Sequence, residues 1–337
     1  MKLACSNCSS IFNFDDSFMY DLKLLSQTKD KAPKCTSCNS PINTDALPEL
    51  FQGDEKNFLR GEALNKKVVG NLKKLYPMPH VTYKARKLIN SSNASFLEIG
   101  NILKTDPALA GRILKVANSA YYGMSGEISS IQHAATMLGG DTLIQIITLV
   151  SNSKVLGKSL SGYDINSGDL WKHAITTAVC ANILSIKRSP EDEEDSFFAG
   201  LMHDSGKIIL DSYIVERQEI FNRYLSKSKA PFQKAESLIL GFNHAHTGYE
   251  LCLKWNLPKR LAGAIKHHHN PSAAGDNKLA YVLNIANYMA KPLNNNPDEN
   301  MDQIKLSLKY LGFSESDMVA LKEEAYNAVE ALEEDTY

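Results

Sequence analysis

Histidine residues are concentrated in the second half of the chain. The sequence contains nine histidines, and six of them lie between His203 and His269. Imidazole nitrogens and carboxylate oxygens together bind borderline divalent cations. The adjacent pair His203-Asp204 offers both kinds of ligand from one short stretch of chain. This clustering predicts a metal centre, and the ions that suit it are iron, manganese or another divalent metal.

Four of the six cysteines form two C-x-x-C pairs near the N-terminus. They are Cys5, Cys8, Cys35 and Cys38. Four thiolates bind Zn²⁺ tetrahedrally, and a segment too short for its own core folds only when the metal binds. A redox dithiol is the alternative, but a thioredoxin-like C-x-x-C lies in a βαβ unit, which this stretch lacks. We predict a zinc ribbon with short β-hairpins over residues 1–45.

The histidines must be positioned by helices, because the pattern after the first part of the chain is helical. From about residue 66 onward, apolar residues recur at steps of three and four, and glycine, proline or asparagine marks the breaks. Asp106-Pro107 is typical of a helix start, since aspartate caps the first turn and proline fits its first position. This predicts an all-α fold. Further helices are expected at about residues 169–187, 196–204, 206–225, 231–240, 244–255, 258–268 and 278–290.

The pattern divides the chain into four parts. Residues 46–65, after the predicted ribbon, are polar and weakly periodic and are expected to form a linker or a loosely held short helix. Residues 66–293 form one helical domain, with an N-terminal subdomain over about 66–160 and a histidine-containing subdomain over about 165–293. Residues 294–337 form a C-terminal helical extension, whose second helix is predicted to begin at Ser314 with Asp317 in a capping box.

Charge and hydropathy exclude several classes of partner. The chain has 37 basic and 38 acidic residues, so its net charge of -1 gives no field that attracts nucleic acid or an anionic membrane. Nucleic-acid binding by the lysines of the predicted ribbon is an alternative, but nearby aspartates dilute their charge. No apolar run approaches the roughly 18 residues of a membrane span. No apolar segment precedes Cys5 as in a signal peptide, so we expect a cytoplasmic protein.

A series of motifs follows in order along the helical region. They include Leu75-Tyr76-Pro77-Met78-Pro79, Asp106-Pro107-Ala108-Leu109, Val116-Ala117-Asn118-Ser119-Ala120-Tyr121-Tyr122-Gly123 and Trp255-Asn256-Leu257-Pro258. In this order they resemble the HDOD family, the HD-related output domains of bacteria, over about residues 70–290. The resemblance implies an all-α domain in which a helical N-terminal subdomain packs against an HD-like subdomain. It also implies a regulatory role in bacterial signal transduction, through binding of proteins or ligands.

The order of the histidines is similar to that in metal-dependent phosphohydrolases of the HD superfamily. The matching residues are His173, His203, Asp204, His244, His268 and His269, and the resemblance implies that they bind metal. The stretch from His203 to Lys207 looks like the HD-x-G-K turn of that superfamily, whose lysine contacts a substrate phosphate in active members. The run ending at His269 also fits a helix C-terminus, where imidazolium groups interact favourably with the helix dipole.

One position departs from the superfamily pattern. Where catalytic members place an aspartate, this chain reads Asn284-Ile285-Ala286-Asn287. With Asn287 in that place, Asp204 is the only obvious negative ligand, and a hydrolytic metal site that must activate water is short of charge. We therefore expect a non-enzymatic signalling protein with protein partners. The alternative is a phosphohydrolase or phosphodiesterase acting on a nucleotide or a cyclic (di)nucleotide, and a bound small nucleotide is compatible with both.

Overall fold

The computed structural model describes residues 2–4, 11–13, 59–75, 103, 106–123, 127–190, 193–228, 231–291 and 301–336. Near the N-terminus, strand β1 (Lys2–Ala4) pairs antiparallel with strand β2 (Ile11–Asn13), and Ala4 lies opposite Ile11. The four cysteines of the predicted zinc ribbon lie outside the described residues. The ribbon therefore stays a prediction.

The rest of the described chain is helical, which confirms the predicted all-α fold. The helices are α3 (Gly61–Leu75), α6 (Pro107–Ala117), α7 (Ile131–Leu138), α8 (Gly140–Leu156), α9 (Asp169–Arg188), α10 (Glu193–Met202), α11 (Ser205–Val215), α12 (Gln218–Ser228), α13 (Phe232–Ile239), α14 (His244–Lys254), α15 (Lys259–His267), α16 (Lys278–Met289), α17 (Met301–Leu311) and α18 (Glu315–Thr336). Short 3₁₀ helices are η1 (Ala120–Tyr122), η2 (Ser161–Tyr163) and η4 (Pro271–Ala274).

Helix starts follow the local signals in the sequence. The Asp106 carboxylate accepts a hydrogen bond of 3.0 Å from the backbone N–H of Leu109 at the start of α6. At the start of α18, the Asp317 carboxylate accepts from the Ser314 N–H at 2.8 Å, and the Ser314 hydroxyl accepts from the Asp317 N–H at 3.1 Å. Both arrangements satisfy N–H groups that a helix leaves unpaired at its first turn.

Two boundaries differ from the sequence prediction. The single helix expected over residues 206–225 is broken into α11 and α12, because the buried Arg217 side chain folds back to donate to the Tyr213 carbonyl at 2.7 Å. Helix α3 begins at Gly61, inside the segment predicted as a linker, and the Gly61 N–H donates to the Leu240 carbonyl at 2.8 Å. The end of the predicted linker is therefore part of the helical fold.

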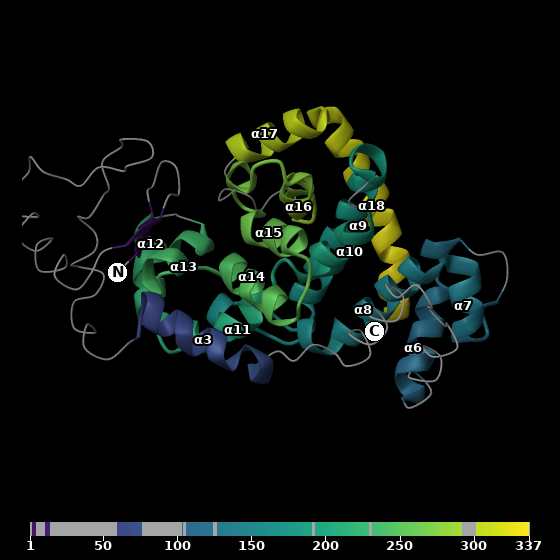
Figure 1. Cartoon of the computed structure of the whole chain (residues 1–337), viewed down its shortest axis with the longest axis horizontal. Coiled ribbons are helices and arrows are strands. Elements are labelled where there is room, and N and C mark those ends of the chain that lie inside the picture. The colour runs from purple at the N-terminus through teal and green to yellow at the C-terminus, as the bar shows by residue number, and fades with distance from the viewer. Residues whose placement is uncertain are drawn as a thin grey trace, which may run out of the picture.

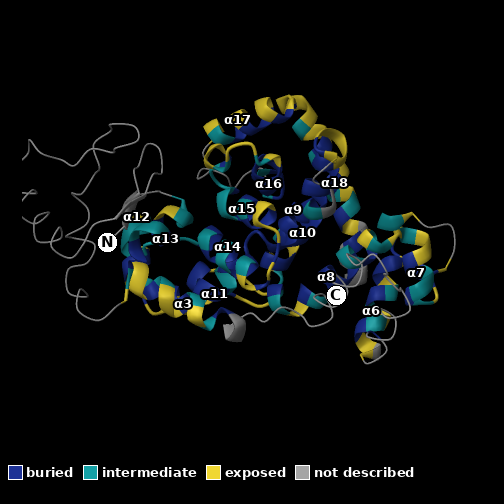
Figure 2. Cartoon of the chain, in the orientation of Figure 1, coloured by how far each residue is buried: buried dark blue, intermediate teal, exposed yellow. Residues whose placement is uncertain are grey.

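Helix α9 lies at the centre of the molecule and packs against α10, α16 and α18 (Figure 1). Its residues 174–185 are all buried, whereas α17 exposes its outer face (Figure 2). Helices α6 and α7 lie at one end of the molecule, and α3, α12 and α13 lie at the other (Figure 1). Helix α18 contacts α9, α6 and η1, so the C-terminal extension joins the two predicted subdomains.

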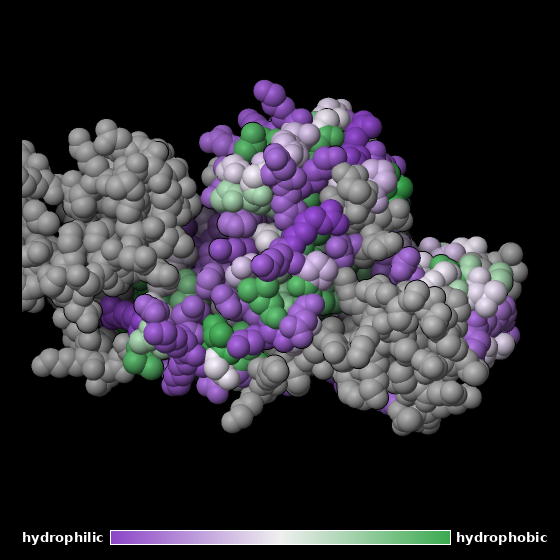
Figure 3. Space-filling view, viewed as in Figure 1, coloured by the Kyte–Doolittle hydropathy of each residue, from purple (hydrophilic) through white to green (hydrophobic). Residues whose placement is uncertain are grey.

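The described surface in the view of Figure 3 is largely hydrophilic, and its apolar side chains form small separate groups. Among the described helices, none is both long and apolar enough to cross a bilayer.

Candidate metal centre

The structure brings together all seven residues predicted to form the metal site. Five elements or their ends supply them: α9, the α10–α11 junction, the first residue of α14, the end of α15, and α16. The residues are His173, His203, Asp204, His244, His268, His269 and Asn287. They surround the carboxylate of Asp204, which is 2% exposed. Their proximity is a finding, and their role as metal ligands stays a prediction.

The Asp204 carboxylate lies between two groups of side chains. We call the group of His173, His203 and Asn287 the His173 subsite, and it faces Asp204 Oδ2. We call the group of His244, His268 and His269 the His244 subsite. In that subsite, one ligand atom from each histidine and one Asp204 oxygen all lie within 4.8 Å of one another. Each set is compact enough for one metal ion.

Close packing of α11 against α14 brings Asp204 to His244. Gly206 lies in the first turn of α11, and a Cβ atom built on it would be only 2.0 Å from the backbone oxygen of His244. No side chain fits in that space, so only glycine allows the two helices to approach this closely. Close contact between the two helices is therefore the reason for a glycine at this position.

Hydrogen bonds fix the proton positions in the His173 subsite. The His203 Nδ1 atom lies 2.7 Å from the Gly200 carbonyl oxygen, which only accepts, so Nδ1 donates a proton to it. The His173 Nε2 atom lies 3.0 Å from Asn287 Oδ1, which accepts its proton, and 3.2 Å from His203 Nε2. The polar groups of this subsite therefore have hydrogen-bond partners within the protein.

The His244 subsite contains acceptors that face one another. His268 Nδ1 lies 2.7 Å from the Ile265 carbonyl oxygen and His244 Nδ1 lies 2.7 Å from Glu236 Oε2, so both Nδ1 atoms donate. Burial lowers the pKa of His268, so its Nε2 atom carries a lone pair, 3.9 Å from Asp204 Oδ1. His244 Nε2 lies 3.2 Å from the same oxygen and 3.0 Å from His269 Nε2.

Neither Asp204 Oδ1 nor His268 Nε2 has a hydrogen-bond partner among the described residues. The approach of His244 Nε2 to Asp204 Oδ1 is close enough for an ion pair but is not aligned as a hydrogen bond. Buried acceptors without a donor are costly, and a cation between them removes that cost. The donor set of three imidazoles and one carboxylate therefore fits a divalent ion such as zinc or iron.

The charges around Asp204 are uneven. Lys207 Nζ lies 2.6 Å from Asp204 Oδ2 and neutralises that oxygen, whereas Oδ1 faces only the histidines. Burial raises the pKa of the Asp204 carboxyl, but His203 and Lys207 outweigh this and hold the pKa well below its usual range. Burial lowers the pKa of His173 to about 3, and it lowers the pKa of His268 and His269 well below the usual value. Asp204 is thus ionised at neutral pH, and these three imidazoles are neutral.

Sequence reasoning missed Glu236, a charged residue of this site. Glu236 lies on α13 with no exposed surface, and its Oε2 atom accepts from the backbone N–H and the Nδ1–H of His244. A signal was present, because Glu236 lies beside Ala235 and one turn before Ile239 on the buried face of α13. A carboxylate is almost never fully buried without a partner.

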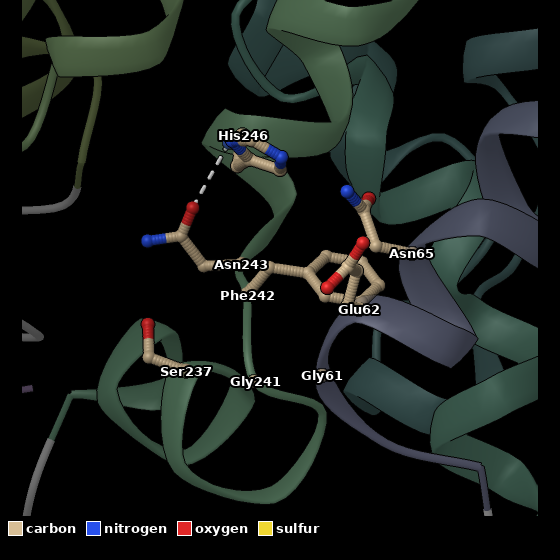
Figure 4. Close-up of a pocket in the computed structure, with 8 residues that line it drawn as sticks. All are labelled: Gly61, Glu62, Asn65, Ser237, Gly241, Phe242, Asn243 and His246. Carbon is tan, nitrogen blue, oxygen red and sulfur yellow. Dashed lines mark hydrogen bonds between the residues drawn. The ribbon is translucent and has the colours of Figure 1, made fainter. Parts of the chain in front are cut away.

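A pocket beside the site marks the contact of α3 with the α13–α14 turn (Figure 4). Its lining includes Glu62 and Asn65 of α3, Ser237 of α13, and Asn243 and His246 at the start of α14. The Asn243 side chain accepts from the His246 backbone N–H at 3.0 Å, which caps α14. None of the seven predicted ligands lines this pocket.

Comparison with solved structures shows the same fold in several bacterial proteins. An HDOD domain protein of unknown function from Geobacter sulfurreducens is 21% identical, with a TM-score of 0.62 over 80% of this chain and 99% of that one. A Shewanella amazonensis SB2B protein, named after an inferred phosphohydrolase activity, is 21% identical with a TM-score of 0.62 over 80% and 98%. A Marinobacter aquaeolei VT8 protein, named after an inferred signal-transduction role, is 19% identical with a TM-score of 0.61 over 87% and 64%.

Sequence comparison agrees with the fold. An uncharacterized protein of Treponema pallidum (strain Nichols) is 24% identical over 212 residues, which are 62% of this chain and 40% of that protein. This chain thus matches less than half the length of that relative. The family model of the HDOD domain matches residues 75–271, which is more than half of the chain and includes every predicted ligand of the His/Asp centre except Asn287. The chain therefore belongs to the HDOD domain family.

Proposed function

We propose that this protein is a regulatory output protein of bacterial signal transduction that acts by binding, and that its His244 subsite holds one divalent cation. The observation that carries the proposal is the asymmetry of Asp204. Its Oδ2 atom is paired with Lys207, whereas its Oδ1 atom is buried against imidazole lone pairs without a donor among the described residues. One cation in the His244 subsite satisfies these atoms and ties α11, α14 and the end of α15 together.

Several features oppose hydrolysis at this site. A two-metal phosphodiester hydrolase clamps the attacking and leaving oxygens with two cations that it must hold firmly. In the His173 subsite, the Asn287 amide stands where a second carboxylate would bind, and the Lys207 ammonium lies against the oxygen that a second cation would share. Asp204 is then the single negative ligand for two cations. One cation alone can activate a bound water, but it does not supply that clamp.

Metal content and turnover measured on the same preparations test this proposal. We expect the purified full chain to hold one nitrogen- and oxygen-ligated divalent ion, which His268→Ala removes and Cys35→Ser does not. We also expect no hydrolysis of bis-p-nitrophenyl phosphate or of cyclic dinucleotides when Mn²⁺ or Fe²⁺ is added. Metal-dependent turnover that disappears in Asp204→Asn would overturn the non-enzymatic proposal. A chain without an ion that depends on His268 would overturn the metal proposal.

A phosphohydrolase is the second candidate function, and one observation favours it. The side chains of His173 and Lys207 are 19% and 21% exposed, so solvent reaches one side of an otherwise buried site. Lysine beside a metal centre is suited to contact a phosphate. The name of the Shewanella amazonensis relative points to the same class of reaction. The turnover assay above decides between the two functions, because it uses nucleotide and non-nucleotide phosphodiesters.

The N-terminal cysteines complete the proposal. Cys5, Cys8, Cys35 and Cys38 bind one Zn²⁺ in a ribbon that offers a second surface to protein partners. Support comes from the pairing of β1 with β2, because Cys5 and Cys8 lie in the segment that connects these strands. The proposed setting is the cytoplasm, where thiolates stay reduced and available to the metal. The metal analysis of Cys35→Ser tests this zinc site directly.

A further inference from the structure

We infer that Glu236 is a positioning residue that orients and polarises His244, and that it makes the His244 subsite the preferred metal position; this rests on the function proposed above. Glu236 Oε2 accepts two hydrogen bonds from His244, from Nδ1 at 2.7 Å and from the backbone N–H at 3.0 Å. The Glu236 residue is 0% exposed and His244 is 3% exposed. The carboxylate therefore fixes the ring of His244 from behind.

The second oxygen of Glu236 is also held. The Tyr163 hydroxyl donates to Glu236 Oε1. Burial and the charge of Glu236 raise the pKa of Tyr163 well above its ordinary value, so this phenol keeps its proton at neutral pH. Tyr163 belongs to η2, which is attached to α11 because the Gly162 N–H donates to Asp211 Oδ1 at 2.7 Å. Glu236 thus has one orientation, with Tyr163 on one oxygen and His244 on the other.

The backbone between Glu236 and His244 is held by α3. Gly241 has φ +87°, and a Cβ atom on it would be 2.6 Å from Gly61 Cα, so the α13–α14 turn and the start of α3 touch through two glycines. The Gly61 N–H donates to Leu240 in the same turn at 2.8 Å. Figure 4 shows this junction, with Gly61 and Gly241 facing each other below the pocket. The α13–α14 turn, which sets the distance between the Glu236 carboxylate and the His244 imidazole, is therefore held in place by α3.

This arrangement distinguishes the two subsites. The Nδ1 atoms of His203 and His268 face neutral carbonyl groups, and only that of His244 faces a carboxylate among these three rings. A carboxylate on Nδ1–H makes Nε2 a more basic ligand and adds negative charge behind the metal position. Glu236 thereby offsets, for the His244 subsite alone, the charge that Asn287 fails to supply at the His173 subsite. The result is a centre built for one cation.

Glu236→Gln tests the inference because glutamine has the same shape but no charge. We expect the Kd of the full chain for Co²⁺ to rise about 10- to 100-fold, the usual effect of losing such an outer partner. We also expect a changed d–d absorption spectrum of the bound Co²⁺, which distinguishes ligand positioning from a loss of stability. Cobalt bound by thiolates in the predicted ribbon has d–d bands of its own, so the bands of this centre are taken as those that His268→Ala removes. Glu250→Gln is the matched control, because Glu250 on α14 contacts none of the predicted ligands in the described structure and only approaches His246, at 4.0 Å.

The outcomes separate this inference from the proposed function. If the wild-type chain binds no Co²⁺ that depends on His268, both fail. If the wild-type chain binds it and Glu236→Gln binds it with the same Kd and spectrum, the inference alone fails. If Glu236→Gln loses its helical circular dichroism, Tyr163→Phe replaces it, since that variant removes the hydroxyl that holds Glu236. We then expect a Kd raised several-fold with an altered Co²⁺ spectrum, and an unchanged Kd would overturn the inference.

Discussion

At the scale of single residues, the chemistry of this centre depends on how protons and charges are distributed around Asp204. Three imidazoles donate from Nδ1 to partners that only accept, and this turns three Nε2 atoms toward one carboxylate. Lys207 neutralises the charge on one oxygen of that carboxylate. We therefore propose one cation position among these seven residues, beside a second group whose members hydrogen-bond to one another.

Asn287→Asp is expected to convert the His173 subsite into a second metal position. A carboxylate placed 3.0 Å from His173 Nε2 adds the negative charge that this subsite lacks and accepts the metal directly. We expect the metal content at the His/Asp centre to rise from one to two ions per chain when the protein is saturated with Mn²⁺ and analysed by mass spectrometry. Asn152→Asp, another buried asparagine but on α8, should leave the content unchanged. An unchanged content in Asn287→Asp would contradict our account of the asymmetry.

At the scale of elements, α11 and α14 must stay in contact because they supply Asp204 and His244. Gly206→Ala places a methyl group 2.0 Å from the His244 carbonyl oxygen, so α14 has to move. We expect a loss of about 1–3 kcal/mol in the free energy of unfolding, measured with urea, and weaker binding of Co²⁺. Gly263→Ala in α15 is the matched control, since its nearest neighbour would be 3.5 Å away. Alanine there favours the helix by up to about 1 kcal/mol. Equal effects of the two substitutions would refute the role of close packing.

The elements also show which features are readable from sequence. Helix starts at Asp106 and Ser314 depend on neighbours three residues away, and both were predicted correctly. The break at Arg217 was missed because the residue reaches Leu59, far away in sequence, as well as a carbonyl of its own helix. Glu236 was missed for the same reason, since its partner Tyr163 is 73 residues away. The order of the histidine motif predicted that these residues come together. The contact of Glu236 with His244, which distinguishes the two subsites, could be found only from the structure.

At the scale of the whole molecule, the predicted subdomains are joined by the C-terminal extension and by α3. Helix α18 buries Leu321, Ala325, Val329 and Leu332, and it packs against α9 as well as α6 and η1. Helix α3 packs against α11 and α14, next to the metal centre. The α9 helix, which carries His173, therefore lies between the metal centre and the α6–α7 end of the molecule. A ligand that shifts α9 would therefore move residues at both ends of the molecule.

The pH dependence of stability is a property of the whole molecule. In the metal-free protein, we expect the histidines of the centre to make the largest contribution to it. The pKa values of His173, His268 and His269 are lowered by burial. Below pH 6.5 these three imidazoles are therefore protonated in the unfolded chain but not in the folded chain. Stability from these three groups is present above pH 6.5 and is lost as the pH falls. His244 acts in the opposite sense. Burial lowers its pKa, but Glu236 and Asp204 raise it by more, so the net shift is upward. Its contribution to the stability of the fold is present below pH 6.5 and is lost as the pH rises above its folded pKa.

The difference approaches three protons, because His244 is protonated in both the folded and the unfolded chain below pH 6.5 and adds nothing to the slope there. We therefore expect the free energy of unfolding of the chelator-treated protein to fall with a limiting slope of about 4 kcal/mol per pH unit between pH 6.5 and 5. Urea unfolding at half-unit steps of pH measures this slope. His268→Asn removes one of the three groups and should reduce the slope by about 1.4 kcal/mol per pH unit. A slope that is the same in the wild type and in His268→Asn would mean that these imidazoles are not held neutral by the fold, and the lone pairs assigned to the His244 subsite would then carry protons instead.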